Sequence, residues 1–196
     1  METVFKRLPM ILVIDFGSQY NQLIARRVRE AGVYCQIEPP TIAVETVKSL
    51  QPQGIILSGG PSSIYEKNSP KIDPAVFDLA IPVLGIFYGM QYMVDALGGT
   101  VRQASKREYG FAELSLKKAG GLFAGVRQKA QCWMSHWDSI EKLPSGFTVT
   151  AVTANTPIAA TVHSQKNLFG LQFHPEVEHT PQGRQMIRNF LFDVCR

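Results

Sequence analysis

The chain has 196 residues, of which 45% are hydrophobic, and a formal net charge of +4 at neutral pH. This length is typical of one domain with a substantial core. No apolar run approaches the roughly 20 residues that cross a bilayer, and the N-terminus lacks the layout of a signal peptide, so we expect a cytoplasmic protein. The basic residues are scattered, which argues against nucleic-acid binding. The three cysteines are widely spaced and form neither a metal-ligand pattern nor a disulfide framework.

Short apolar runs alternate with amphipathic stretches along the first half of the chain. They predict strands at residues 11–14, 34–37, 54–57 and 82–86, and helices at residues 21–31, 41–50 and 74–80. Beyond residue 99 the pattern is more β-like, with strands expected at residues 111–116, 130–134, 147–152, 158–161 and 169–173, and a last helix at about residues 182–194. Strand and helix in alternation indicate an α/β fold, with a mixed, mainly parallel sheet flanked by helices. In such folds the active-site loops lie at the carboxyl ends of the parallel strands.

The most informative local pattern lies where the strand expected at residues 82–86 runs into a helix. Gly85 and Gly89 flank a sharp turn, and helical spacing follows from Gln91. A strand, turn and helix of the form Gly-x-nucleophile-x-Gly make a nucleophile elbow, which presents one side chain beside N–H groups that can bind an oxyanion. The side chain presented here is Phe87, which has no lone pair and no proton to give, and therefore cannot attack a carbonyl carbon.

Residues 85–91, Gly-Ile-Phe-Tyr-Gly-Met-Gln, resemble the nucleophile motif of class I glutamine amidotransferases, in which Cys stands at the position of Phe87. Four further segments resemble the same family in the same order, and specifically its GMP synthase branch; they are residues 11–30, 55–63, 133–138 and 169–177. The resemblance implies a flavodoxin-like fold. It also implies an amidotransferase domain over residues 10–196, preceded by a short leader at residues 1–9.

The resemblance assigns catalytic roles to three positions. In the family a thiolate attacks the carboxamide of glutamine, a His acts as general base and acid, and a carboxylate orients the His. His174 and Glu176 match the last two groups, and Phe87 occupies the position of the nucleophile. Loss of a triad nucleophile typically costs on the order of 10⁶ in kcat. We therefore expect this chain to have lost glutaminase activity.

Two other sets of residues match binding positions of the family. Gly60, or its neighbour Gly59, and the N–H of Tyr88 match the donors of the oxyanion hole. The positions that bind glutamine are matched by Gln91, Ser135, His136, Trp137 and Asp138.

Trp137 departs from the family pattern, which usually has Gly at this position. The segment around it resembles the one that holds the amino-acid end of glutamine, with Asp138 at the α-amine. Gly allows close backbone approach, whereas Trp adds bulk and restricts the backbone. Together with Phe87, this change suggests a pocket that is closed or repurposed. A Trp ring that points to solvent would instead leave the pocket unchanged.

Three readings of the function stay open. The first is the glutaminase half of a GMP synthase, disabled by the loss of its nucleophile. The second is a non-catalytic binding or regulatory module on the amidotransferase fold, which Trp137 favours. A third and weaker idea is a hydrolase that uses His174 and Glu176 with a bound water.

The resemblance also predicts partners. In most bacterial GMP synthases an ATP-pyrophosphatase domain follows and makes GMP from XMP, ATP and ammonia. This sequence shows no such domain and no phosphate-binding loop, because residues 58–61 lack the Lys and the spacing of one. We expect no metal or cofactor in this domain, with ATP and Mg²⁺ only in a partner synthetase domain, and glutamine or a related small molecule as ligand if the pocket is open. A fragment, a stand-alone paralogue and a separate subunit all fit this sequence.

Overall fold

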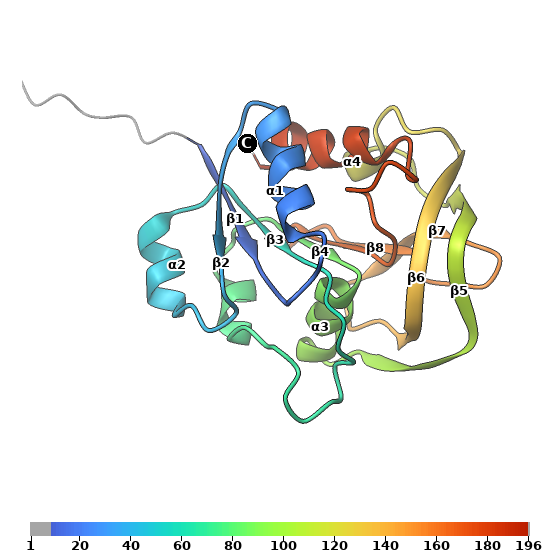
Figure 1. The fold of residues 1–196 in the computed structure, drawn as a ribbon, viewed down its shortest axis with the longest axis horizontal. Coiled ribbons are helices and arrows are strands. Elements are labelled where there is room, and N and C mark those ends of the chain that lie inside the picture. Colours follow the sequence, from blue (N-terminus) through green and yellow to red (C-terminus); the bar gives the residue numbers. More distant parts are fainter. Residues whose placement is uncertain (1–8, 196) are drawn as a thin grey trace, which may run out of the picture.

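The computed structural model describes residues 9–195, without the side chains of residues 105–107, 136 and 137. The chain forms a nine-stranded sheet with helices packed on both faces (Figure 1). The leader expected at residues 1–9 lies outside the described residues, apart from Pro9. In the part of the chain that is described, no helix has both the length and the apolar character needed to cross a membrane.

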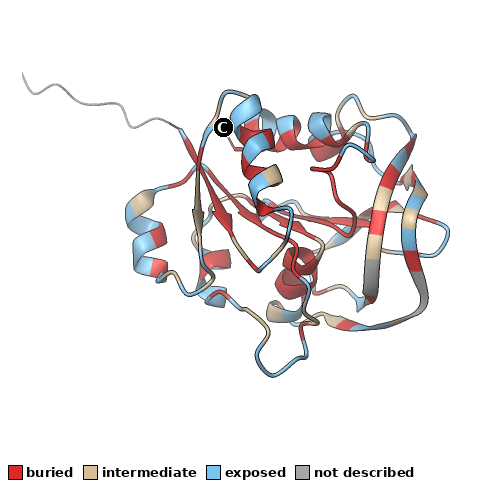
Figure 2. Cartoon of the chain, viewed as in Figure 1, coloured by how far each residue is buried: buried red, intermediate tan, exposed pale blue. Residues whose placement is uncertain are grey.

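The parallel half of the sheet contains five strands, β1 (Met10–Ile14), β2 (Tyr34–Glu38), β3 (Gly54–Leu57), β4 (Val83–Ile86) and β9 (Leu168–Leu171). Every residue of β1, β3, β4 and β9 is buried, as the red strands through the centre of Figure 2 show. Because helices cover both faces of a parallel sheet, its inner strands are continuous apolar runs.

The antiparallel half contains four strands, β5 (Thr100–Leu116), β6 (Lys129–Lys142), β7 (Thr148–Val152) and β8 (Ala160–His163). The sheet order is β2-β1-β3-β4-β9-β8-β7-β5-β6, and the two halves join where β8 pairs antiparallel with β9. The long hairpin of β5 and β6 forms one end of the molecule (Figure 1).

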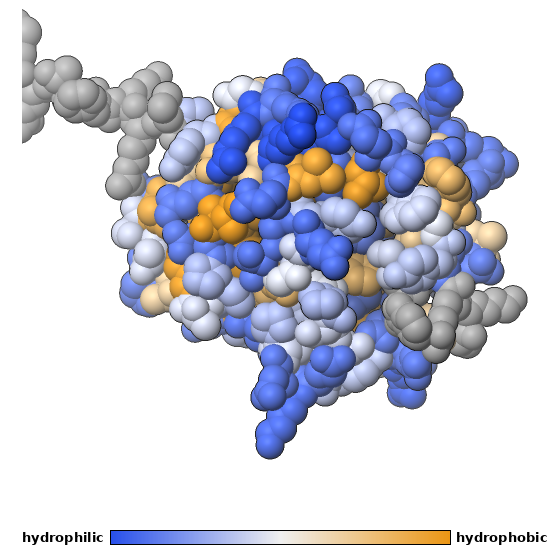
Figure 3. All heavy atoms as spheres, viewed as in Figure 1, coloured by the Kyte–Doolittle hydropathy of each residue, from blue (hydrophilic) through white to orange (hydrophobic). Residues whose placement is uncertain are grey.

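Each face of the parallel half packs against its own helices. The helices are α1 (Asn21–Glu30), α2 (Val44–Leu50), α3 (Tyr88–Ala96) and α4 (Gly183–Asn189), with short helical turns η1 (Pro74–Asp78), η2 (Gly121–Phe123) and η3 (Phe190–Val194). Ile11 and Val13 of β1 pack in one core cluster with α1 and α4, whereas Leu12 and Ile14 pack in the other with α2 and α3. This period of two is the alternation expected of a strand. On the face shown in Figure 3, hydrophilic residues cover most of the surface and hydrophobic ones lie in separate patches.

The predicted α/β class and mainly parallel sheet are confirmed, and four elements differ from their predicted form. The helix expected at residues 74–80 is the 3₁₀ turn η1, which ends before Ala80, a residue with φ of 56° that no helix accommodates. The last helix changes from α to π geometry at Phe190. Strands β5 and β6 run well beyond residues 111–116 and 130–134. An apolar pattern underestimates their length, because β6 lies at the edge of the sheet and contains polar, half-exposed residues.

Candidate active site

The turn between β4 and α3 has the geometry of an elbow. Phe87 lies at its tip with φ of 52° and ψ of −109°, a backbone conformation that residues other than Gly rarely adopt. Its N–H donates a hydrogen bond of 2.7 Å to the carbonyl of Leu171, at the end of β9. A Cβ atom on Gly89 would lie only 2.4 Å from the carbonyl oxygen of Leu57, so the turn fits against β3 only with Gly at this position. The strained backbone is therefore held in place although the residue at the tip has no nucleophilic atom.

His174 and Glu176 follow β9 and lie close to the elbow. The Nδ1 atom of His174 is 2.8 Å from Oε1 of Glu176, and the two residues are only 3% and 0% exposed. Since a carboxylate only accepts hydrogen bonds, Nδ1 donates here, and in the neutral imidazole Nε2 is then the acceptor. The other carboxylate oxygen, Oε2, is buried and has no hydrogen-bond partner among the described residues. The structure thus brings together the two groups predicted as base and orienter.

Two aromatic rings enclose the imidazole of His174. The ring of Phe87 stacks on it, with ring centroids 5.3 Å apart and planes inclined by 28°. The ring of Tyr20 approaches at 5.2 Å in an edge-on arrangement. Tyr20 was not predicted as a site residue, because the loop after β1 gives no sign in the sequence of reaching the carboxyl end of β9.

The remaining nitrogen of His174 is bound by Ser135. The hydroxyl oxygen of Ser135 lies 2.7 Å from Nε2, so with Nε2 unprotonated the hydroxyl donates this hydrogen bond. Ser135 belongs to β6, and it reaches His174 because β6 runs beside the loop that follows β9, where the N–H of His174 donates to the carbonyl of Trp133 over 3.1 Å. The sequence predicted Ser135 as a glutamine-binding residue and gave no signal of this contact.

The residues predicted for the oxyanion hole lie beside the elbow. A Cβ atom on Gly59 would lie 3.6 Å from Cε1 of His174 and 3.7 Å from Cβ of Phe87, so this loop adjoins both. A Cβ atom on Gly60 would be 2.7 Å from a backbone oxygen, which excludes any larger residue there. Tyr88 is the first residue of α3, and an N–H in the first turn of a helix has no acceptor within that helix.

A cavity of about 350 Å³ adjoins the elbow. Phe87, Gln91 and Asp138 line it, together with Ser63 and Tyr65, which the sequence did not predict. Both hydroxyl groups donate to the carboxylate of Asp138, that of Ser63 over 2.5 Å. Burial and the bond to Asp138 raise the pKa of Tyr65, so its hydroxyl keeps its proton at neutral pH. Asp138 thus places a carboxylate in the lining of a cavity of this size, and a carboxylate suits the ammonium group of a small amino acid.

Gln91 also contacts Asp138, but through the backbone: its Nε2 donates to the carbonyl of Asp138 over 3.2 Å. The side chains of His136 and Trp137 lie outside the described residues, so the prediction that Trp137 closes the pocket stays a prediction. Three of the five predicted glutamine-binding residues are thus described. Two of them, Gln91 and Asp138, line the cavity, and the third, Ser135, binds His174 instead.

None of the cysteines stands at the elbow. Cys35, Cys132 and Cys195 are all buried as free thiols. Burial raises the pKa of Cys132 and of Cys195 to about 12, which leaves their thiols protonated and poorly nucleophilic. Within the described residues no group of three or more His, Cys, Asp or Glu side chains could hold a metal ion.

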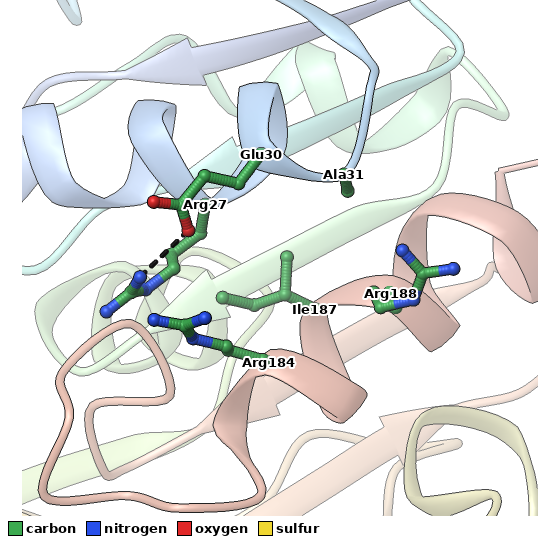
Figure 4. A pocket seen from close by; sticks show the side chains of 6 residues that line it. All are labelled: Arg27, Glu30, Ala31, Arg184, Ile187 and Arg188. Atoms are coloured by element: carbon green, nitrogen blue, oxygen red, sulfur yellow. Dashed lines mark hydrogen bonds and ion pairs between the residues drawn. The ribbon is translucent and has the colours of Figure 1, made fainter.

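A buried arginine contacts the backbone of the His174–Glu176 segment. The Nε atom of Arg27, on α1, donates to the carbonyl of Glu176 over 2.9 Å. Its two terminal nitrogens form ion pairs with Glu30 at 2.9 Å and with Glu178 at 2.7 Å. Figure 4 shows Arg27 and Glu30 on α1 facing Arg184 of α4 across a small surface pocket. No pattern in the sequence indicates Arg27 as a site residue, because its contact with Glu176 joins residues 149 positions apart.

The family model for glutamine amidotransferase class-I matches residues 12–194. The chain therefore belongs to the class I glutamine amidotransferase family. It is similar to the GMP synthase [glutamine-hydrolyzing] of Heliobacterium modesticaldum, with 56% identity over 185 residues, and to that of Ruminiclostridium cellulolyticum, with 53% over 186 residues. These matches cover 94% and 95% of this chain but only 36% of each relative, so the chain spans little more than a third of their length.

Two solved structures share the fold. A candidate GMP synthase subunit from Thermoplasma acidophilum superposes with a TM-score of 0.85 at 31% identity, over 96% of this chain and 94% of that one. A glutamine amidotransferase from Thermotoga maritima superposes with a TM-score of 0.76 at 17% identity, over 97% of this chain and 99% of that one. The resemblance read from residues 85–91 and the four further segments is thus confirmed at the level of the family and of its GMP synthase branch.

Proposed function

We propose that the chain is the amidotransferase part of a GMP synthase, in which glutamine hydrolysis has been lost because Phe87 stands at the nucleophile position. The observation that carries this proposal is the stacking of the Phe87 ring on His174. The ring occupies the space beside the base, and a hydrocarbon cannot form the thioester on which the family's chemistry depends. The high pKa values of Cys132 and Cys195 argue against a replacement thiol.

The remaining parts of the site support an otherwise intact amidotransferase pocket. The His174–Glu176 pair, the Gly59–Gly60 loop and the cavity at Asp138 are all arranged around the elbow. In this proposal His174 and Glu176 keep the roles of base and orienter, and Gly59 or Gly60 with the N–H of Tyr88 binds the oxyanion. Gln91 and Asp138 hold glutamine, with the Asp138 carboxylate on its α-amine.

The partner of such a domain would be an ATP-pyrophosphatase domain or subunit in the cytoplasm, with ATP and Mg²⁺ bound there. The length of the relatives supports this partner, because the chain spans only 36% of each of them. Ammonia released here would be consumed there in making GMP from XMP.

Ammonia release from glutamine tests the proposal. We would compare wild type, Phe87→Cys and Phe87→Ala, each alone and with the synthetase domain of a GMP synthase. Wild type and Phe87→Ala should be silent, and Phe87→Cys should gain activity by several orders of magnitude, up to about 10⁶. Clear wild-type activity that the Phe87→Ala variant retains would contradict the proposal.

A second function, a non-catalytic binding module, is favoured by the cavity at Asp138, which persists beside Phe87. Silence of both wild type and Phe87→Cys in the ammonia assay would support it. Calorimetry with glutamine then separates an open pocket from a closed one. If the wild-type chain releases no ammonia but binds a synthetase domain, that domain is the partner of the binding module.

A further inference from the structure

We propose that Ser135 is the nucleophile of a second activity, the hydrolysis of carboxylic esters that carry an aromatic group. Ser135, His174 and Glu176 form a continuous hydrogen-bond chain, with 2.7 Å from Oγ to Nε2 and 2.8 Å from Nδ1 to Oε1. A hydroxyl, an imidazole and a carboxylate in this order make a catalytic triad. Triads are identified by geometry and not by the order of their residues along the chain.

The environment of His174 favours Ser135 as its proton donor. The imidazole is 3% exposed, and its Nδ1 is fixed by a carboxylate that is fully buried. Phe87 covers one face of the ring and Tyr20 approaches it edge-on, and neither offers a proton to Nε2 in this structure. Ser135 is half-buried, so the residue that contacts the buried imidazole is itself in part accessible to solvent.

An aromatic surface next to Ser135 offers a place for the substrate. Direct partners across β5 and β6 share one face of the hairpin, and Tyr109 lies opposite Ser135 while Phe111 lies opposite Trp133. Tyr109 and Phe111 are 68% and 62% exposed. Phe111 and Trp133 meet edge-to-face with centroids 5.1 Å apart. Exposed rings in such an arrangement bind other aromatic groups by stacking and edge contacts.

The reaction is an ordinary acyl transfer to water. The Oγ atom of Ser135 forms a bond to the ester carbonyl carbon, and its proton passes to Nε2 of His174. The bond to the alcohol oxygen then breaks, and His174 returns the proton to the leaving alcohol. Water, deprotonated by His174, attacks the acyl-serine; the bond from the acyl carbon to Oγ breaks, His174 returns the proton to Oγ, and the acid leaves.

This inference does not rest on the proposed loss of glutaminase activity. It requires only the triad and the hairpin surface, and it makes no use of the cavity at Asp138. The two ideas therefore fail separately. Ammonia release from glutamine tests Phe87, whereas covalent labelling tests Ser135.

The first experiment treats the full chain with diisopropyl fluorophosphate, which phosphorylates an activated serine. Peptide mass spectrometry should find one adduct, on Ser135. The adduct should be absent from Ser135→Ala and strongly reduced in His174→Gln. Ser139→Ala is the matched control, since Ser139 is a half-buried serine of the same strand, and it should be labelled as wild type is. No adduct on wild type, or an adduct that persists in Ser135→Ala, would overturn the proposal.

Turnover of an aryl ester, 4-nitrophenyl acetate, tests the substrate class. Wild type should show a burst followed by steady hydrolysis, and Ser135→Ala should lower the rate at least about 100-fold. Phe111→Ala should raise KM for the aryl ester several-fold with kcat nearly unchanged, and should leave phosphorylation of Ser135 as in wild type. If Ser135→Ala is misfolded by circular dichroism, Ser135→Cys provides the second test, because an activated thiol there should be alkylated by iodoacetamide faster than free cysteine. Equal alkylation rates would sink the idea.

Discussion

The ring of Phe87 stacks on the imidazole of His174, with 28° between the ring planes and 5.3 Å between the centroids. His174 and Glu176, the residues proposed as base and orienter, keep their 2.8 Å hydrogen bond, while the side chain that faces the imidazole is a hydrocarbon. Phe87 also packs against both core clusters, one on each face of the sheet. Its side chain is thus part of the packing of the molecule as well as the tip of the elbow.

The carboxylate of Glu176 should control any activity that Phe87→Cys gains. In the Phe87→Cys background, Glu176→Gln should lower kcat for glutamine by about 10⁴, because an amide no longer fixes the tautomer of His174 or stabilises its charged form. Steady-state kinetics of ammonia release gives the ratio. Equal rates with and without the carboxylate would show that Glu176 does not act as the orienter of His174.

Asp138 should act on binding more than on chemistry. In the same Phe87→Cys background, Asp138→Asn should raise KM for glutamine by about 10-fold or more with a smaller change in kcat, since a charge-assisted hydrogen bond contributes about 1.5–3 kcal/mol. Tyr65→Phe is the matched comparison, because it removes one hydrogen bond to the carboxylate and keeps the charge. Its effect on KM should be smaller. A fall in kcat alone would contradict this placing of glutamine.

Gly89 should be intolerant of substitution although it lies in a helix. Gly→Ala in a helix normally stabilises by about 1 kcal/mol, but a Cβ here would lie 2.4 Å from the carbonyl oxygen of Leu57. We expect Gly89→Ala to lower the free energy of unfolding by at least about 2 kcal/mol. Gly59→Ala, whose Cβ would meet only ordinary contacts of 3.6 Å or more, should change it by less than about 1 kcal/mol. Urea denaturation measures both, and similar losses would refute the argument.

Arg27 should make stability depend on acid pH. Hydrogen bonds from Arg27 and then Arg26 hold the pKa of Glu30 below its ordinary 4.5, and those from Arg27 and then Arg184 do the same for Glu178. In the unfolded chain both carboxyls return to the ordinary value, so as the pH falls the unfolded state binds protons first. The stabilisation is therefore complete above about pH 4.5 and is lost as the pH falls through the lowered folded values.

The measurement is urea denaturation of wild type and Arg27→Gln from pH 7 down to about pH 3. The variant should be less stable at pH 7, and the difference should shrink toward the acid end. Arg184→Gln, which removes a partner of Glu178 only, should show a smaller effect with the same sign. A difference that stays constant over the whole range would assign the role of Arg27 to its bond with the Glu176 carbonyl alone.

Much of the fold could be predicted from the sequence because the inner parallel strands are buried on both faces and read as unbroken apolar runs. The site residues on the loops after β3, β4 and β9 could be predicted because each belongs to a short segment that resembles the family. Three contacts could not be predicted: that of Ser135 with His174, that of Tyr20 with the same ring, and that of Arg27 with the carbonyl of Glu176. Each of these contacts joins segments far apart in the chain, and its existence depends on how β6 and α1 pack against the end of β9.

The elbow has a consequence for how this protein could change. The unusual backbone angles of residue 87 are imposed by main-chain atoms, through the bond to Leu171 and the close approach of Gly89 to Leu57. The scaffold therefore fixes the backbone at residue 87 through contacts that do not involve the Phe87 side chain. An exchange of Phe87 for Cys would therefore change the group displayed at the tip while the main-chain contacts that hold the turn stay available, so a family member could pass between the two forms by one substitution.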